Sequence, residues 1–262
     1  MLELKGVSKT FNKGTVNEKL ALNNVDLVLN DGDFVTVIGS NGAGKSTLLN
    51  VISGAFQNDE GTITLAGQNI TKMPEHRRAR LLGRVFQDPL MGTAPDMQID
   101  ENLGIAYRRG KARTLKWGVT KAERKMYREK LKELNLGLED RLSQKVGLLS
   151  GGQRQAITLL MASLRKPKLL LLDEHTAALD PKTAKKVLDL SEQIASSDGI
   201  TTLMITHNLT DAIRYGNRLI MMNAGQIVYD VSGEEKKKLT KADLMEKFSA
   251  SNIEVSDKEA LS

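Results

Sequence analysis

One nine-residue segment restricts the fold of this chain more than any other. It follows the apolar run 34–38 and precedes the helical pattern 48–53, and it consists of Gly39, Ser40, Asn41, Gly42, Ala43, Gly44, Lys45, Ser46 and Thr47. A strand, a glycine-rich loop and a helix in this order form a phosphate-binding loop, because backbone N–H groups and the helix N-terminus surround phosphate oxygens. The segment predicts a nucleoside triphosphate site and leaves kinases, GTPases, motors and transport ATPases open.

Two side chains of this loop are expected to bind the nucleotide and its metal ion. We expect Lys45 to reach the β- and γ-phosphates of the nucleotide. We expect the Ser46 hydroxyl to ligate Mg²⁺, a hard ion that prefers oxygen donors and keeps most of its waters. The loop therefore predicts ATP or a related nucleotide together with magnesium.

Two adjacent acids end a leucine-rich run later in the chain. Four leucines at 169–172 predict a buried strand, and Asp173 and Glu174 follow at its carboxyl end. One carboxylate at a strand end can hold Mg²⁺ through water, while the next polarises the attacking water. We therefore expect Asp173 at the metal and Glu174 at the hydrolytic water.

Composition excludes several classes of protein. The 262 residues carry 40% hydrophobic and 27% charged residues, which is ordinary for a globular protein and too apolar for wholesale disorder. The absence of cysteine excludes disulfides, Cys-ligated zinc and a thiol nucleophile. We expect neither a secretion signal nor a membrane span, because no basic stretch leads into an apolar run and no 18 uncharged apolar residues are consecutive.

The order of apolar runs predicts the architecture. Four runs predict strands of a mostly parallel sheet: 33–38, 168–172, 200–206 and 218–223. Three runs near the N-terminus predict an antiparallel sheet: 2–11, 21–30 and 61–66. Three helical patterns lie between residues 88 and 165: 100–107, 120–136 and 151–164. We expect an α/β fold with a helical insertion.

A second group of motifs identifies a family. The segment 149–153 reads Leu-Ser-Gly-Gly-Gln and opens a predicted helix. Here the chain resembles the ATP-binding subunit of ABC transporters, of the bacterial importer type. The resemblance covers residues 2 to 230 and rests on six motifs in order: the phosphate loop at 39–47, Gln87, the segment 149–153, Asp173-Glu174, Asp180 and His207.

The resemblance implies roles for several further residues. In this family two subunits pack head to tail, so ATP lies between the phosphate loop of one and the 149–153 segment of the other. Ser150 and the N–H groups of Gly151 and Gly152 would close on the γ-phosphate from across the dimer, and Gln153 would belong to the same nucleotide-binding segment. Gln87 would contact Mg²⁺ or the water, and His207 would bind the γ-phosphate and orient Glu174. Each site would be incomplete in a single subunit.

Two more residues have both a family role and a simpler structural one. Phe11 matches an aromatic residue that stacks on adenine, and simple core packing is the alternative. Asp180 would link the two sites across the dimer interface. The alternative for Asp180 is a helix cap, because Asp followed by Pro181 is favourable at a helix start.

The chain departs from the family pattern at two positions, neither of which removes a catalytic group. Ser40 and His175 stand where many relatives have proline. We interpret His175 as a local variant rather than a catalytic residue, although it follows Glu174 directly. His76 lies in a strongly charged stretch and is expected to be solvated.

The resemblance also divides the chain into parts. We expect a P-loop ATPase core with a mostly parallel sheet, an N-terminal antiparallel β-subdomain and an inserted helical subdomain. Residues 1–87 and 166–230 would form the RecA-like core with the β-subdomain, and 88–165 the helical subdomain with the 149–153 motif. Residues 231–262 would be a partly mobile C-terminal extension with a short helix at 241–248.

The family resemblance implies partners and a place of action. We expect an ATPase that dimerises on ATP, as a homodimer or with a homologous subunit, and drives a membrane permease docked near 88–107. It would lie on the cytoplasmic face of the membrane and serve import of a small, amino-acid-like solute delivered by an external binding protein. The alternatives are the ATPase of an exporter or lipoprotein-releasing system and, third, a soluble non-transport ABC ATPase.

One segment carries most of the positive charge. Residues 107–132 hold eleven Lys or Arg against two Glu, whereas the whole chain is only +6. Two interpretations are a contact with anionic lipid headgroups and a solvated helix in which Glu123 and Glu129 pair locally. Trp117 is interpreted as local packing. We expect no nucleic acid, because no nucleic-acid-binding motif accompanies the charge.

Overall fold

The N-terminal part of the chain forms an antiparallel sheet. The computed structural model describes residues 1–110 and 118–250. The sheet has the order β2-β1-β4-β5, and its strands are β1 (Leu2–Phe11), β2 (Lys19–Leu29), β4 (Glu60–Leu65) and β5 (Gln68–Asn69). β1 alternates buried and exposed residues toward its start, which fits a sheet with one covered face.

The second sheet is the centre of the molecule and has the order β10-β9-β3-β8-β7-β6. Its strands are β3 (Phe34–Ile38), β6 (Leu82–Val85), β7 (Leu169–Asp173), β8 (Thr202–Ile205), β9 (Arg218–Asn223) and β10 (Gln226–Ser232). Neighbouring strands are parallel except for β9 and β10. β3, β8 and four residues of β7 are entirely buried, as expected for parallel strands covered on both faces.

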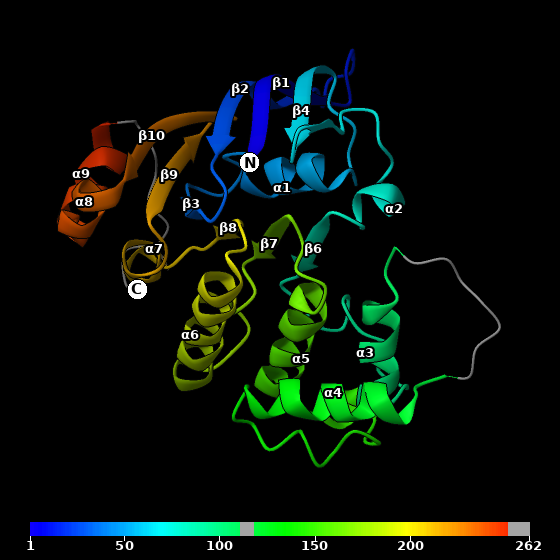
Figure 1. The fold of residues 1–262 in the computed structure, drawn as a ribbon. Helices are drawn as coiled ribbons and strands as arrows, with labels where there is room; N and C mark the ends of the chain where they lie inside the picture. Colours follow the sequence, from blue (N-terminus) through cyan, green and yellow to red (C-terminus); the bar gives the residue numbers. More distant parts are fainter. Residues whose placement is uncertain (111–117, 251–262) are drawn as a thin grey trace.

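Helices cover both faces of the central sheet (Figure 1). α1 (Lys45–Ser53) lies between the two sheets, and its apolar residues share a core with both. α5 (Gly151–Ser163) and α6 (Pro181–Asp198) cover the opposite face. The expected α/β fold, with its antiparallel and mostly parallel sheets, is confirmed.

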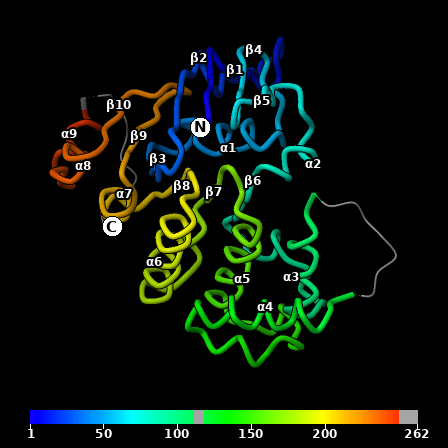
Figure 2. Tube along the Cα trace, in the orientation of Figure 1, coloured from blue at the N-terminus to red at the C-terminus, as the bar shows by residue number. Residues whose placement is uncertain are grey.

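Some of the remaining helices pack against β3, β9 and β10 of the central sheet, and others lie farther from it. The remaining helices are α2 (Glu75–Arg78), α3 (Ile99–Tyr107), α4 (Lys121–Lys132), the 3₁₀ turn η1 (Val146–Leu148), α7 (Leu209–Arg214), α8 (Gly233–Lys238) and α9 (Lys241–Ala250). α3 lies beside α5, and α4 lies at the end of the molecule farthest from the antiparallel sheet, as the chain trace in Figure 2 shows. None of the helices within 1–110 and 118–250 combines the length and apolarity that crossing a bilayer would require.

Parallel strands bring distant motifs to one edge of the central sheet. β3, β6, β7 and β8 point the same way, and Asp173 is in register with Ile205, as Val37 also is. The segments after these strands start at residues 39, 86, 174 and 206. Carboxyl ends of parallel strands meet at one edge, so the phosphate loop, Gln87, Glu174 and His207 gather there.

Some expected elements differ from the observed ones. The helix predicted at 120–136 ends at Lys132, and Asn135 has a positive φ of 53°, which a helix does not continue through. The sequence analysis did not predict β10, which is an edge strand of the central sheet, or α8, which follows β10 in the chain. Trp117, the basic residues at 111–116 and the polar tail at 251–262 lie outside the described residues.

The described part of the basic segment contains the helix α4, which has a capping box and several ion pairs. Thr120 and Glu123 make a reciprocal capping box at the start of α4. Glu123 also lies 2.9 Å from the guanidinium of Arg108. These contacts agree with local pairing of Glu123.

A fully buried arginine closes the C-terminal end of α1. Arg78 Nη1 donates to the carbonyls of Val51 and Ile52 at 2.7 and 2.8 Å. Its Nε and Nη2 donate to Met73 and Thr71 at 2.7 and 2.9 Å. The last carbonyls of a helix lack intrahelical donors, so Arg78 satisfies them and joins α1 to the segment before α2.

Arg78→Met is expected to lower the free energy of unfolding by about 3 kcal/mol, since buried carbonyls would lose their donors. Urea unfolding followed by far-ultraviolet circular dichroism measures this loss. Arg77→Met is the matched control, because Arg77 is exposed on the same helix and its loss should change stability by less than about 0.5 kcal/mol. Equal stability of the two variants would contradict the capping role of Arg78.

Candidate active site

The phosphate loop wraps closely against neighbouring backbone. Gly39 has a φ of +148°, and a Cβ there would lie 2.2 Å from the carbonyl oxygen of Met222. Gly44 has a φ of +103°, and its Cβ would lie 2.5 Å from the carbonyl of Ala21. Both distances are shorter than any non-bonded contact between carbon and oxygen atoms, so only glycine fits at these two positions.

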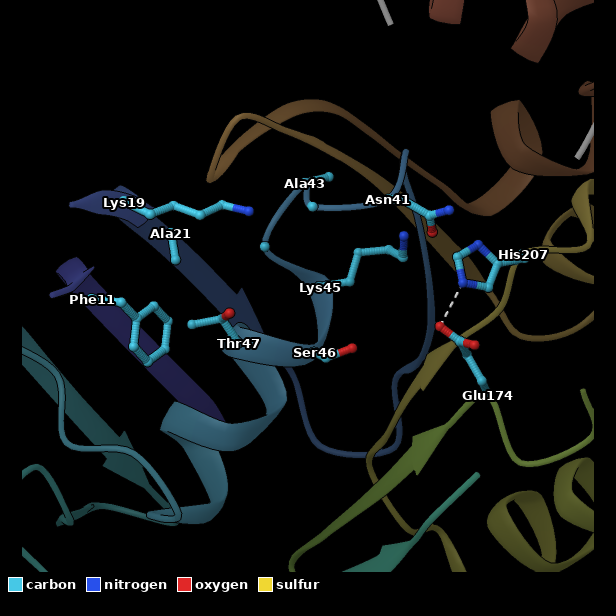
Figure 3. Close-up of a pocket in the computed structure, with 12 residues that line it drawn as sticks. Phe11, Lys19, Ala21, Asn41, Ala43, Lys45, Ser46, Thr47, Glu174 and His207 are labelled. Carbon is cyan, nitrogen blue, oxygen red and sulfur yellow. Dashed lines mark ion pairs between the residues drawn. The ribbon is translucent and has the colours of Figure 1, made fainter. Parts of the chain in front are cut away.

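Lys45 begins α1 and is 5% exposed. Its Nζ donates to the carbonyls of Gly39 and Ser40, at 3.0 Å for Ser40. Because these carbonyls belong to the phosphate loop, the ammonium group lies inside the curve of the loop. Figure 3 shows Lys45 and Ser46 pointing from the start of α1 into the same space.

The loop, two strands and two strand ends enclose a pocket of about 220 Å³. Its lining residues are Phe11, Lys19, Ala21, Asn41, Gly42, Ala43, Gly44, Lys45, Ser46, Thr47, Glu174 and His207. The sequence analysis missed Lys19 and Ala21, which belong to β2 and carry no motif. Phe11 lies at the end of β1 and packs edge-on against Phe56, with ring centroids 5.2 Å apart.

Glu174 and His207 form an ion pair on the side of the pocket opposite Phe11 (Figure 3). His207 Nε2 lies 2.6 Å from Glu174 Oε1. The hydrogen bond from His207 holds the pKa of Glu174 below its ordinary value against the opposing effect of burial, and the charge of Lys45 adds to the lowering. Glu174 is therefore a carboxylate at neutral pH. Its backbone has a positive φ of 46°, which is uncommon for a residue with a side chain.

Asp173 is held by an arginine that the sequence analysis did not identify. Arg84 Nη2 lies 3.3 Å from Asp173 Oδ2 and also donates to Asn50 Oδ1 at 2.8 Å. Burial raises the pKa of Asp173, and the charge of Arg84 opposes this rise. Arg84 lies on β6, a strand that the sequence analysis did not predict.

Gln87 faces a neighbouring, larger hollow. This hollow has a volume of about 740 Å³, and Asn41, Glu174 and His207 line it together with Gln87. Gln155 on α5 donates from Nε2 to the Phe86 carbonyl at 3.1 Å, which fixes the residue before Gln87. Gln87 therefore lies on the same side of the sheet edge as the Glu174–His207 pair.

The residues of the 149–153 motif lie apart from the pocket. Ser150 caps α5 by accepting from the Gln153 backbone at 3.3 Å, and the Gln153 side chain accepts from Ser150 in return. Neither hollow described above is lined by these residues, nor by Gly151 or Gly152, in this single subunit. The start of α5 meets the start of α6, because a Cβ on Gly152 would lie 2.0 Å from Thr183.

Asp180 is exposed and caps α6. Its Oδ1 accepts from the Thr183 backbone at 3.1 Å, and Pro181 follows as the first helical residue. This is the helix-cap alternative of the sequence analysis. The hydrogen bonds from Thr183 lower the pKa of Asp180.

The two other histidines lie outside the pocket. His175 is buried, and its Nε2 lies 2.9 Å from the Ser191 hydroxyl on α6. Burial lowers the pKa of His175 to about 4, so it is neutral at physiological pH and packs in the core. His76 is exposed on α2.

A phosphate loop on an α/β core, with a carboxylate–histidine pair facing its lysine, defines a P-loop nucleoside triphosphatase. Comparison with known proteins then gives the family. The ABC transporter family matches residues 22–177. The tyrosine transport ATP-binding protein of Clostridioides difficile (strain R20291) is 46% identical, over 95% of this chain and 98% of its own length. The chain belongs to the ABC transporter family, and it is an ATPase that hydrolyses ATP for transport.

Solved structures agree with this assignment. The dimeric bacterial ABC transporter cassette MJ0796 is 31% identical, with a TM-score of 0.75, over 88% of this chain and 98% of its own. A dimeric post-hydrolysis state of MJ0796 bound to ADP and Pi is 29% identical over the same shares, with a TM-score of 0.74. The cassette MJ0796 has thus been solved as a dimer, and in one state with ADP and Pi bound.

Proposed function

We propose that this chain powers an importer for an amino acid, with an aromatic amino acid as the first candidate. The ATPase activity in this proposal is supported by one observation: Lys45, Glu174 and His207 line the same pocket. The substrate class is supported by the similarity over nearly the whole length to a protein named for tyrosine transport.

The working unit in this proposal is a head-to-tail dimer. The pocket carries the loop, Glu174 and His207 but not Ser150, whose helix start is outside it. A second subunit would bring its own Ser150, Gly151 and Gly152 to the γ-phosphate, where a helix N-terminus favours negative charge. A homodimer fits because the chain has one set of motifs.

The residues present fit a magnesium ion. The Ser46 hydroxyl lines the pocket, and the Asp173 carboxylate and the Gln87 amide lie at the same sheet edge. All three offer the oxygen donors that Mg²⁺ prefers. When bound, the ion would neutralise charge on the phosphates.

Hydrolysis follows from the groups around the pocket. Glu174, held ionised by His207, would orient the attacking water and accept its proton. His207 would donate to the γ-phosphate, and Lys45 would stabilise the charge that develops on it. Phe11 would support the adenine ring by stacking.

Residues 88–165 would form the lobe that meets the permease. The segment after Gln87 exposes apolar side chains, with Met91 70% and Leu90 43% exposed, and Ile105 on α3 is 56% exposed. Apolar side chains exposed together on a domain of this kind are typical of contact surfaces. The subunit would thus lie at the cytoplasmic face of the membrane, with a solute-binding protein on the outer side.

Co-purification tests the proposal. Tagged Glu174→Gln subunit is isolated with ATP from gently solubilised membranes, and its partners are identified by mass spectrometry. A small permease and a solute-binding protein that binds aromatic amino acids would support import. A permease with a large external domain would favour export or lipoprotein release, and soluble partners alone would overturn transport.

Met91→Glu is expected to reduce permease recovery about tenfold or more, since a charge would replace an apolar contact. The readout is the ratio of permease to tagged subunit in the same preparation. Val228→Glu on β10 is the control, because Val228 is also an exposed apolar residue but lies outside the 88–165 lobe. Equal recovery with both variants would remove Met91 from the docking surface.

A further inference from the structure

The helix that follows His207 is held firmly at its start. Asn208 caps α7 by accepting from the Asp211 backbone at 3.0 Å, and the Asn208 N–H donates to Thr206 Oγ1 at 3.0 Å. Thr36 on β3 also donates to the Ala212 carbonyl at 2.9 Å. His207 thus lies between β8 and a short helix whose placement determines where its ring can point.

A buried lysine of the C-terminal extension contacts the backbone at the other end of α7. Lys236 on α8 is 2% exposed, and its Nζ donates to the carbonyls of Tyr215 and Gly216, at 3.0 Å for Gly216. A cation at the C-terminal end of a helix is favourable because the carbonyls there carry partial negative charge. Burial lowers the pKa of Lys236 to about 8, so the amine remains charged at neutral pH.

α6 holds the same end of α7 from a second side. Tyr215 Oη donates to Asp189 Oδ1 at 2.8 Å, and the Gly216 N–H donates to Glu192 Oε1 at 3.2 Å. Both acids belong to α6, the helix that begins at the exposed Asp180 cap. The Tyr215–Gly216 turn therefore joins α6, α7 and α8.

The apolar contacts agree with this bracing. Leu209 and Ala212 of α7 share a buried cluster with Leu244 and Phe248 of α9. α7 packs against both α8 and α9, which lie beside it in Figures 1 and 2. The described part of the C-terminal extension, residues 231–250, thus contacts the helix next to His207, and none of these residues lines the nucleotide pocket.

We propose that Lys236 is a positioning residue for ATP hydrolysis: it fixes the C-terminal end of α7 so that His207 keeps its ring against Glu174. The proposal rests on the role of His207 proposed above. Through Lys236, the C-terminal extension helps to position a residue of the catalytic site. A change in the packing of α8 would alter turnover without touching the nucleotide.

Lys236→Met tests the proposal in the purified subunit. The side chain keeps its length and loses the charge and the donors, so kcat for ATP hydrolysis is expected to fall about tenfold through misplacement of His207. KM for ATP should stay within about twofold, because the phosphate loop is untouched. The control is Lys237→Met, since Lys237 is exposed on the same helix and pairs with Glu234 at 2.6 Å; it should leave kcat unchanged.

A direct readout of the His207 ring separates positioning from general destabilisation. The chain has three histidines, so ring NMR signals can be assigned with single His→Gln variants. Lys236→Met should shift the His207 signal and leave that of His76 unmoved. An unmoved His207 signal, an unchanged kcat, or a loss of kcat that only matches the loss of folded protein would each overturn the proposal.

Two further variants test the proposal if Lys236→Met does not fold or if His207 has another role. If Lys236→Met does not fold, Tyr215→Phe is measured instead, because it removes the hydrogen bond to Asp189 at nearly constant volume. It should lower kcat two- to threefold at unchanged KM, on the order of one lost hydrogen bond. An unchanged kcat overturns the proposal.

His207→Ala is measured in parallel. If it hydrolyses ATP at the wild-type rate, the proposed role of His207 fails, and the role of Lys236 fails with it. If His207→Ala is inactive and Lys236→Met is fully active, only the role of Lys236 fails.

Discussion

Glu174→Gln is expected to bind ATP and to lose turnover by about 10²- to 10⁴-fold, the usual contribution of a positioned general base. The amide has the shape of the carboxylate but cannot accept the proton of the attacking water. Because the variant also removes a negative charge beside the phosphate site, the ATP-bound dimer should persist. Phosphate release measures turnover, and size-exclusion chromatography with ATP measures the dimer.

The control for this variant is Glu75→Gln. Glu75 is an exposed acid on α2, outside the nucleotide pocket, so the same change of charge should leave turnover as it is. Wild-type turnover in Glu174→Gln would show that another group orients the water. Loss of ATP binding in Glu174→Gln would instead indicate that the carboxylate maintains the pocket.

Lys45→Ala is expected to weaken ATP binding about 100-fold, because a nearly buried cation that pairs with phosphate is removed. Fluorescent-nucleotide titration gives the dissociation constant. Lys45 also donates to the carbonyls of Gly39 and Ser40, so thermal unfolding is measured alongside to detect any loss of loop structure.

Lys5→Ala is the matched control for Lys45→Ala. Lys5 is an exposed residue of β1 that pairs with Glu3 at 2.9 Å, and its loss should leave ATP affinity unchanged. Normal ATP affinity in a folded Lys45→Ala variant would contradict the assignment of residues 39–47 as the phosphate-binding loop.

Most of the pocket could be predicted from local patterns. The phosphate loop is a contiguous segment with a strand before it and a helix after it, so its conformation depends on residues close in sequence. Asp173 and Glu174 are recognisable because two acids end a strand of four leucines. His207 required the family resemblance, since one histidine after a strand has no local signal of its own.

Other parts of the site have no signal in the sequence. Arg84 meets Asp173 across 89 residues, and only the pairing of β6 with β7 brings them together. Lys19 and Ala21 line the pocket because β2 passes beside the start of α1, where Ala21 nearly touches Gly44. Such contacts depend on the register of strands far apart in the chain.

The burial of Lys236 in the C-terminal extension could not be predicted from the local sequence either. The sequence analysis predicted there only a partly mobile extension with a short helix at 241–248, whereas Lys236 is buried against the end of α7. A charged residue can be buried when backbone carbonyls satisfy its donors, and nothing in the local sequence specifies those partners.

The sequence by itself determined the chemistry of this protein: a loop that binds phosphate, acids at the end of a buried strand, and the order of motifs that places the chain in the ABC transporter family. The tertiary structure alone decided how those groups are held: Arg84 beside Asp173, His207 against Glu174, and Lys236 at the end of α7. The physical reason is the separation in sequence between the residues that interact. Loop and strand-end motifs are set by neighbours in sequence, whereas ion pairs and buried caps form between segments that only the packed sheet and helices bring together.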